Sequence, residues 1–167
     1  MRYFLHVMLF VLVSTIFGGC TRTNAFTKFH LSPIQERADS SLRSSKLSNC
    51  NENIGIVSSI YLNEVDLKKY NGMEYFYIEL YTKDGETLYD PNLLEEKKMH
   101  IKLNGHDPIK IAKLDKENSF KTLMPFDNQW NQYYLVAFQK SESEKLSLKL
   151  EDGRFDSLPL EYQKSEQ

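Results

Sequence analysis

The chain has 167 residues, which is enough for one domain and at most two. With 41% apolar and 26% charged residues, its composition is typical of a globular domain rather than of a disordered tail. A formal net charge of −2 without a basic block argues against nucleic-acid binding. The 2 cysteines are too few for a disulfide scaffold or a cysteine-based zinc site.

The first twenty residues have the layout of an export signal. Arg2 supplies a positive charge, an apolar run extends over residues 3–16, and small residues precede Cys20. The apolar run is shorter than the roughly 20 residues that span a bilayer comfortably. The sequence therefore predicts a signal peptide over residues 1–19.

Gly18, Gly19 and Cys20 match the end of a lipobox, so the leader resembles the type II signal peptide of bacterial lipoproteins. The resemblance implies cleavage after Gly19 and lipidation of Cys20 by a diacylglycerol and a further acyl chain such as palmitate, which together anchor a protein stably. Thr21 in place of Asp implies the outer membrane, facing the periplasm or the surface, rather than the inner one. An ordinary cleaved signal peptide or an uncleaved N-terminal anchor stays the alternative.

Residues 20–53 are polar and rich in serine, and predict a flexible tether between the lipid and the domain. Ile34, Ala38 and Leu42 allow at most a short surface helix after Pro33. Cys50 is either a free or intermolecularly paired thiol or a small buried apolar residue.

Residues 54–167 predict an all-β domain, because apolar residues recur with period two over short runs between turns. Seven strands over this length indicate an antiparallel immunoglobulin-like β-sandwich, with a closed barrel as the alternative. Pro159 favours an edge position for the last strand. The predicted strands cover residues 54–62, 74–82, 99–103, a segment from 109, 133–139, 146–150 and 155–162.

The third and fourth strands allow a register to be predicted. A three-residue loop of residues 104–106 would pair Ile101 with Ile109 and Met99 with Ile111, so that both apolar sets share one face. A two-residue loop would place them on opposite faces.

The domain has no pattern that predicts catalysis, a cofactor or a metal. His30, His100 and His106 have no metal-ligand spacing, and no nucleophile elbow, phosphate loop or dinucleotide fingerprint is present. We expect a protein without catalytic residues or cofactors. An enzyme would need acidic residues that converge with His100 or His106.

Aromatic residues mark two candidate binding surfaces. Tyr75, Tyr77 and Tyr81 lie opposite Phe76, Ile78 and Leu80 on the second strand, and form either a ladder that binds a glycan or a face that a loop covers. The connections 83–96 and 115–131 are long and apolar, and are expected at one end of the sandwich, where they either close the core or dock a partner. The candidate docking residues are Leu93, Leu94, Phe120, Met124, Phe126 and Trp130.

These observations favour an envelope lipoprotein, held to a membrane by its lipid, whose sandwich binds an envelope protein as an accessory module. A lipid- or glycan-binding lipoprotein is the alternative, and it predicts an enclosed apolar cavity with a few inward polar groups.

Overall fold

The computed structural model describes residues 31–49, 52–88, 99–124, 128–152 and 156–165. The chain divides into a unit of residues 1–31, almost all of it outside the described residues, and a folded unit from Ser32 to Gln167. The folded unit alone is considered below.

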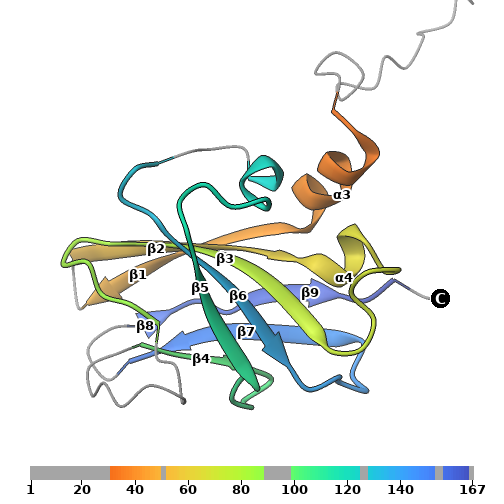
Figure 1. Cartoon of the computed structure of the whole chain (residues 1–167). Helices are drawn as coiled ribbons and strands as arrows, with labels where there is room; N and C mark the ends of the chain where they lie inside the picture. The colour runs from red at the N-terminus through yellow and green to blue at the C-terminus, as the bar shows by residue number, and fades with distance from the viewer. Residues whose placement is uncertain (1–30, 50–51, 89–98, 125–127, 153–155, 166–167) are drawn as a thin grey trace, which may run out of the picture. The chain divides into compact units, whose positions relative to one another are not determined.

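Two antiparallel sheets make up this unit (Figure 1). One sheet has six strands in the order β5-β6-β3-β2-β1-β8, and the other has three in the order β4-β7-β9. The strands are β1 (Leu42–Asn49), β2 (Glu52–Tyr61), β3 (Glu74–Thr82), β4 (His100–Leu103), β5 (Lys110–Leu114), β6 (Gln132–Phe138), β7 (Lys145–Glu151), β8 (Asp156–Ser157) and β9 (Leu160–Gln163). The helices are α3 (Pro33–Ser41), α4 (Leu62–Val65) and the 3-10 turn η1 (Lys121–Leu123).

The predicted all-β sandwich is confirmed, with nine strands among the described residues in place of about seven. Strand β3 has the predicted bounds, and Phe76, Ile78 and Leu80 are fully buried on its inner face. The Phe76 ring lies 5.0 Å from the ring of Tyr61 and 5.4 Å from that of Tyr162, which belongs to the other sheet. Such offset and edge contacts add to the free energy gained by burying aromatic area.

The prediction that residues 20–53 form a tether is wrong for residues 32–49 and 52–53. Ser32 caps α3, because its hydroxyl accepts from the Gln35 amide while the Gln35 side chain accepts from the Ser32 amide at 2.9 Å. Pro33 occupies the first turn, where its missing N–H costs nothing. Ala38 of this helix is fully buried, so α3 belongs to the folded unit and is more than a surface helix. Cys50 lies outside the described residues.

Strand β1 lies inside the six-stranded sheet, between β2 and the edge strand β8, although its sequence is polar. It pairs with β2 over its whole length and with β8 on its other side. The Ser44 and Ser58 hydroxyls form a hydrogen bond of 2.8 Å across the strands, while Leu47 is fully buried. A Cβ on Gly55 would lie 2.4 Å from the Tyr81 carbonyl oxygen, so only glycine permits this approach of β2 to β3.

The predicted hairpin between β4 and β5 is wrong, because the two strands belong to different sheets. Ile101 pairs with Leu150 of β7, and Ile111 pairs with Val136 of β6. Asn104 and Gly105 form a two-residue turn with φ of 49° and 83°, and the chain then crosses to the other sheet. Because β4 and β5 face the core from different sheets, their apolar residues do not have to pair with one another.

The last predicted strand changes sheets at Leu158 and Pro159 and is split into β8 and β9. Each part forms an edge of its sheet, as the proline predicted.

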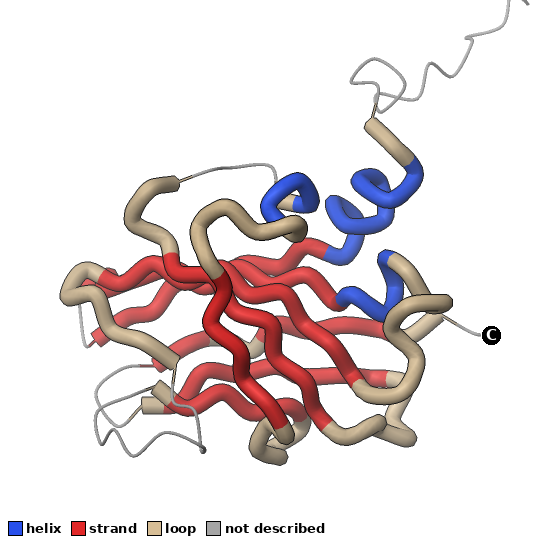
Figure 2. The backbone as a smooth tube through the Cα atoms, in the orientation of Figure 1, coloured by secondary structure: helices blue, strands red, loops and turns tan. Residues whose placement is uncertain are grey.

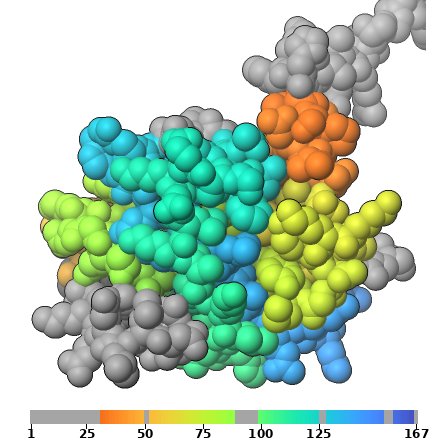
Figure 3. Space-filling model, in the orientation of Figure 1, coloured from red at the N-terminus to blue at the C-terminus, as the bar shows by residue number. Residues whose placement is uncertain are grey.

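A second apolar layer covers part of the outer face of the six-stranded sheet. Figure 2 shows the three short helices gathered on one side of the strands, and in Figure 3 the segment that follows β5 lies beside α3. The Gln35 side-chain amide also donates to the Thr122 carbonyl oxygen at 3.4 Å. The buried residues of this layer are Ala38, Ile60, Leu62, Val65, Tyr70, Tyr77, Met124 and Tyr133. The six-stranded sheet is therefore apolar on both faces.

Candidate functional site

The predicted tyrosine ladder is not an exposed surface. Tyr77 is fully buried, and its ring stacks on Phe120 at 5.3 Å and on Tyr133 at 6.2 Å. Burial raises the pKa of the Tyr77 hydroxyl above its ordinary value. Tyr75 is half-buried against Tyr70, with ring centroids 5.3 Å apart. Tyr81 is the most exposed of the three, with 36% of its area exposed.

The predicted docking residues separate into two groups in the structure. Met124 is buried and Phe120 half-buried in the layer that covers Tyr77, so both cover the outer face of the sheet instead of offering a surface. Trp130 is 67% exposed. Leu93, Leu94 and Phe126 lie outside the described residues.

On the outer face of the sheet, the turn that carries Trp130 lies beside Ile56, which the sequence did not single out, and beside Tyr81. Ile56 of β2 is 48% exposed and pairs directly with Tyr81 of β3. A pocket of about 300 Å³ opens beside this pair. We use "Trp130 surface" for Ile56, Tyr81 and Trp130 together with this pocket, which is lined by Ile56, Ser58, Glu79, Tyr81, Asn128 and Asn131.

The turn that carries Trp130 is held in place by hydrogen bonds. The Asn128 side-chain oxygen accepts from the Trp130 amide at 3.0 Å, and the Asn128 carbonyl accepts from the Asn131 amide at 3.1 Å. Lys116 Nζ donates to the Gln129 carbonyl at 2.7 Å. A tryptophan on a fixed turn loses little backbone conformational entropy when it binds. An Asn-x-Trp-Asn segment between two strands is a signal for such a turn.

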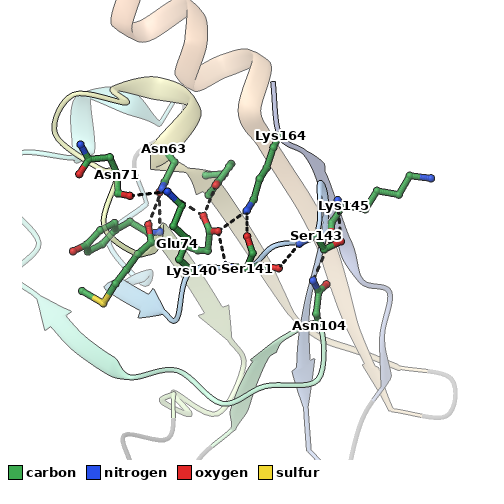
Figure 4. Close-up of polar contacts among 12 residues, drawn as sticks. Asn63, Asn71, Glu74, Asn104, Lys140, Ser141, Ser143, Lys145 and Lys164 are labelled. Carbon is green, nitrogen blue, oxygen red and sulfur yellow. Dashed lines mark hydrogen bonds and ion pairs between the residues drawn. The ribbon is translucent and has the colours of Figure 1, made fainter. Parts of the chain in front are cut away.

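A second polar cluster surrounds Glu74, the first residue of β3 (Figure 4). Its carboxylate is almost fully buried and accepts from Tyr61 Oη at 2.5 Å, from Lys164 Nζ at 2.6 Å and from the Ser141 amide at 2.9 Å. Lys164 Nζ also donates to the Ser141 carbonyl at 2.5 Å. The cluster therefore joins β2, β3, the β6–β7 connection and the chain after β9.

The electrostatics of this cluster favour an ionised Glu74. Burial alone would raise the pKa of Glu74, but hydrogen bonds from Lys164, Tyr61 and Ser141 and the charge of Lys164 outweigh it and hold the pKa below its ordinary value. Burial and the hydrogen bond to Glu74 raise the pKa of Tyr61, so the phenol stays protonated and donates. An open pocket of about 370 Å³ adjoins the cluster. Because each of these groups is engaged, we interpret the cluster as a structural connection between the two sheets.

The histidines do not gather in the described part of the chain. His100 begins β4, and His106 follows the turn after that strand, so they flank opposite ends of β4. His30 lies outside the described residues. Within the ranges that the structure describes, no three His, Cys, Asp or Glu side chains are close enough to hold a metal ion. No helix in those ranges is long and apolar enough to cross a membrane.

Comparison of the chain with protein-family models, with curated proteins and with solved structures found no match.

Proposed function

We propose that the chain is a lipid-anchored protein of the bacterial envelope whose β-sandwich docks an envelope protein through the Trp130 surface. The observation that carries this proposal is the exposure of Trp130 on a fixed turn, whose Asn128 and Asn131 line the pocket beside the exposed Ile56 and Tyr81. Tryptophan and tyrosine are enriched among the residues that supply most of the binding energy in protein interfaces. Apolar side chains exposed together on a small domain favour a partner.

The shape of the domain supports a protein partner over a lipid. A lipid needs an enclosed apolar cavity, whereas three pockets that are lined by described residues open to solvent. Their walls mix charged and apolar side chains, among them Glu74, Lys140 and Glu79. A protein with a complementary surface fits such shallow sites.

The anchor is the first part of the proposal to test, since Cys20 lies outside the described residues. We expect the Cys20→Ser variant, expressed in a bacterial host, to lose labelling by an alkyne fatty acid and to leave the membrane fraction. The Cys50→Ser variant, which removes the other cysteine, should keep both properties. Membrane retention of Cys20→Ser without label would show that the leader is an uncleaved anchor. Separation of inner from outer membranes tests the proposed outer-membrane location.

The docking surface is tested by crosslinking in intact envelopes. We expect Trp130→Ser to reduce the yield of one defined crosslinked protein at least about tenfold, because a buried interface tryptophan contributes about 2 kcal/mol or more. Leu158→Ser is the matched control, since Leu158 is 79% exposed and lies outside the Trp130 surface. Equal yields from both variants, with unchanged thermal unfolding, would contradict docking through Trp130.

A further inference from the structure

The dipeptide Asn-Gly occurs twice in the chain, as Asn71-Gly72 and as Asn104-Gly105. In this dipeptide the backbone nitrogen of glycine can attack the asparagine side chain, because glycine has no Cβ to hinder the approach. The nitrogen bonds to Cγ, the bond from Cγ to Nδ2 breaks, and ammonia leaves with the proton of the attacking nitrogen. Water then opens the resulting succinimide ring to aspartate or isoaspartate. An amide thereby becomes a carboxylate without an enzyme.

The fold restrains the Asn104 side chain. Its Oδ1 accepts from the Ser147 amide at 2.8 Å, and its Nδ2 donates to the Lys145 carbonyl oxygen at 3.2 Å (Figure 4). The Asn104 amide also donates to the Ser147 carbonyl oxygen at 2.9 Å, which continues the pairing of β4 with β7 past Leu103. Both hydrogen bonds of the carboxamide must therefore break before Cγ can turn towards the Gly105 nitrogen.

The Asn71 side chain lacks this restraint. Asn71 is exposed at the rim of the pocket beside Glu74, and in the described part of the chain no hydrogen bond engages its carboxamide. The contact that Asn71 does make is through its backbone carbonyl, which accepts from Lys140 Nζ at 3.4 Å. A Cβ on Gly72 would meet no atom within 4 Å, so the surroundings leave room for the succinimide ring.

We infer that Asn71 is a site of spontaneous deamidation in the folded protein, and that the fold protects Asn104 from the same reaction. Both asparagines are exposed and both precede a glycine, so we assign the difference to the hydrogen bonds that hold Asn104 in its turn. The reaction places a carboxylate on the residue that Lys140 contacts, and adds a negative charge to the rim of the pocket beside Glu74. This inference is independent of docking through the Trp130 surface.

The test follows both sites in the full chain during incubation at mildly alkaline pH, in native buffer and in guanidinium chloride. Proteolytic digestion and mass spectrometry measure the replacement of NH₂ by OH at each site, and chromatography separates the aspartate and isoaspartate peptides. In the folded protein we expect the reaction at Asn71 to be at least about tenfold faster than at Asn104, because two hydrogen bonds must break first at Asn104. In guanidinium chloride the two rates should become similar.

The Gly72→Ala variant tests the mechanism. The fold has room for the added Cβ, but this atom hinders the attacking nitrogen. The reaction at Asn71 should therefore slow at least about tenfold, while the midpoint of thermal unfolding and the rate at Asn104 stay unchanged.

Three results would overturn the inference: equal rates at the two sites in the folded protein, a faster reaction at Asn104, or no reaction at Asn71 in native buffer. An unchanged rate at Asn71 in Gly72→Ala would contradict attack by the glycine nitrogen. The crosslinking result for Trp130→Ser bears on docking alone, so the two hypotheses fail separately.

Discussion

A chain shortened to residues 32–167 should fold cooperatively, and a chain shortened to residues 54–167 should not fold. The second truncation removes β1, which lies between β2 and β8, and leaves both neighbours without hydrogen-bond partners on that side. It also removes the buried Leu47 from the core and the buried Ala38 from the layer over the outer face. Single buried leucines already contribute about 2–5 kcal/mol, against a total stability of about 5–15 kcal/mol.

The measurement is thermal unfolding followed by circular dichroism, together with the dispersion of amide signals in NMR spectra. The 32–167 chain should show one cooperative transition and dispersed signals. A cooperative transition of similar midpoint in the 54–167 chain would mean that α3 and β1 add to an already complete domain. That result would restore the boundary expected from the sequence.

The second large effect is expected at Glu74. Its replacement by alanine leaves the Tyr61 hydroxyl and the Lys164 ammonium group without their buried acceptor. Breaking a buried pair in this way lowers the free energy of unfolding by about 3–5 kcal/mol. The melting temperature should fall by about 10–20 °C. Glu144→Ala is the matched control, because Glu144 is exposed on the rim of the adjoining pocket, and it should change stability little. Similar stability of the two variants would contradict the structural role of the cluster.

The stabilisation by Glu74 should depend on pH. The pKa of Glu74 is lower in the folded protein than the ordinary value of 4.5, so the unfolded chain takes up the proton first as the solution is acidified. The contribution is therefore complete above pH 4.5 and declines as the pH falls below it. Urea unfolding at pH 7 and pH 3.5 should show a smaller difference between the wild type and Glu74→Gln at the lower pH. A difference that is constant or grows on acidification would contradict the lowered pKa.

How far the sequence predicts this fold depends on how each strand is stabilised. Strand β3 can be predicted from the sequence, because Phe76, Ile78 and Leu80 occupy alternate positions and are themselves buried in the core. Strand β1 has two leucines five positions apart and four polar residues between them, so its pairing with β2 and β8 stabilises it more than its own hydrophobicity does. The sequence did contain a signal for the start of the folded unit at α3. It is Ser32-Pro33-Ile34-Gln35, a capping box with proline in the first turn of the helix.

The sites were predictable only in part, for a related reason. The sequence marked Trp130 and Tyr81 as candidates, and the structure leaves both exposed. The sequence placed Tyr77 on the correct face of the strand. The residues that cover it belong to α3, α4 and the segment after β5, and the alternation within β3 carries no information about those elements. The partners of Glu74 lie 13, 67 and 90 positions away along the chain, so no local sequence pattern predicts the cluster.

If the chain is anchored through Cys20 as proposed, the start of the fold at Ser32 limits how far from the membrane its domain can reach. If Cys20 carries the lipid, twelve peptide units separate the lipid from the helix cap, and they reach at most about 40 Å. A linker that lasted to residue 53 would reach nearly three times as far. A short linker confines the domain to a layer close to the bilayer. This confinement raises the effective concentration of the domain towards membrane-bound proteins whose binding surfaces lie in the same layer. A partner whose recognition site lies farther from the bilayer than this linker and the width of the domain together would be out of reach, whatever its affinity.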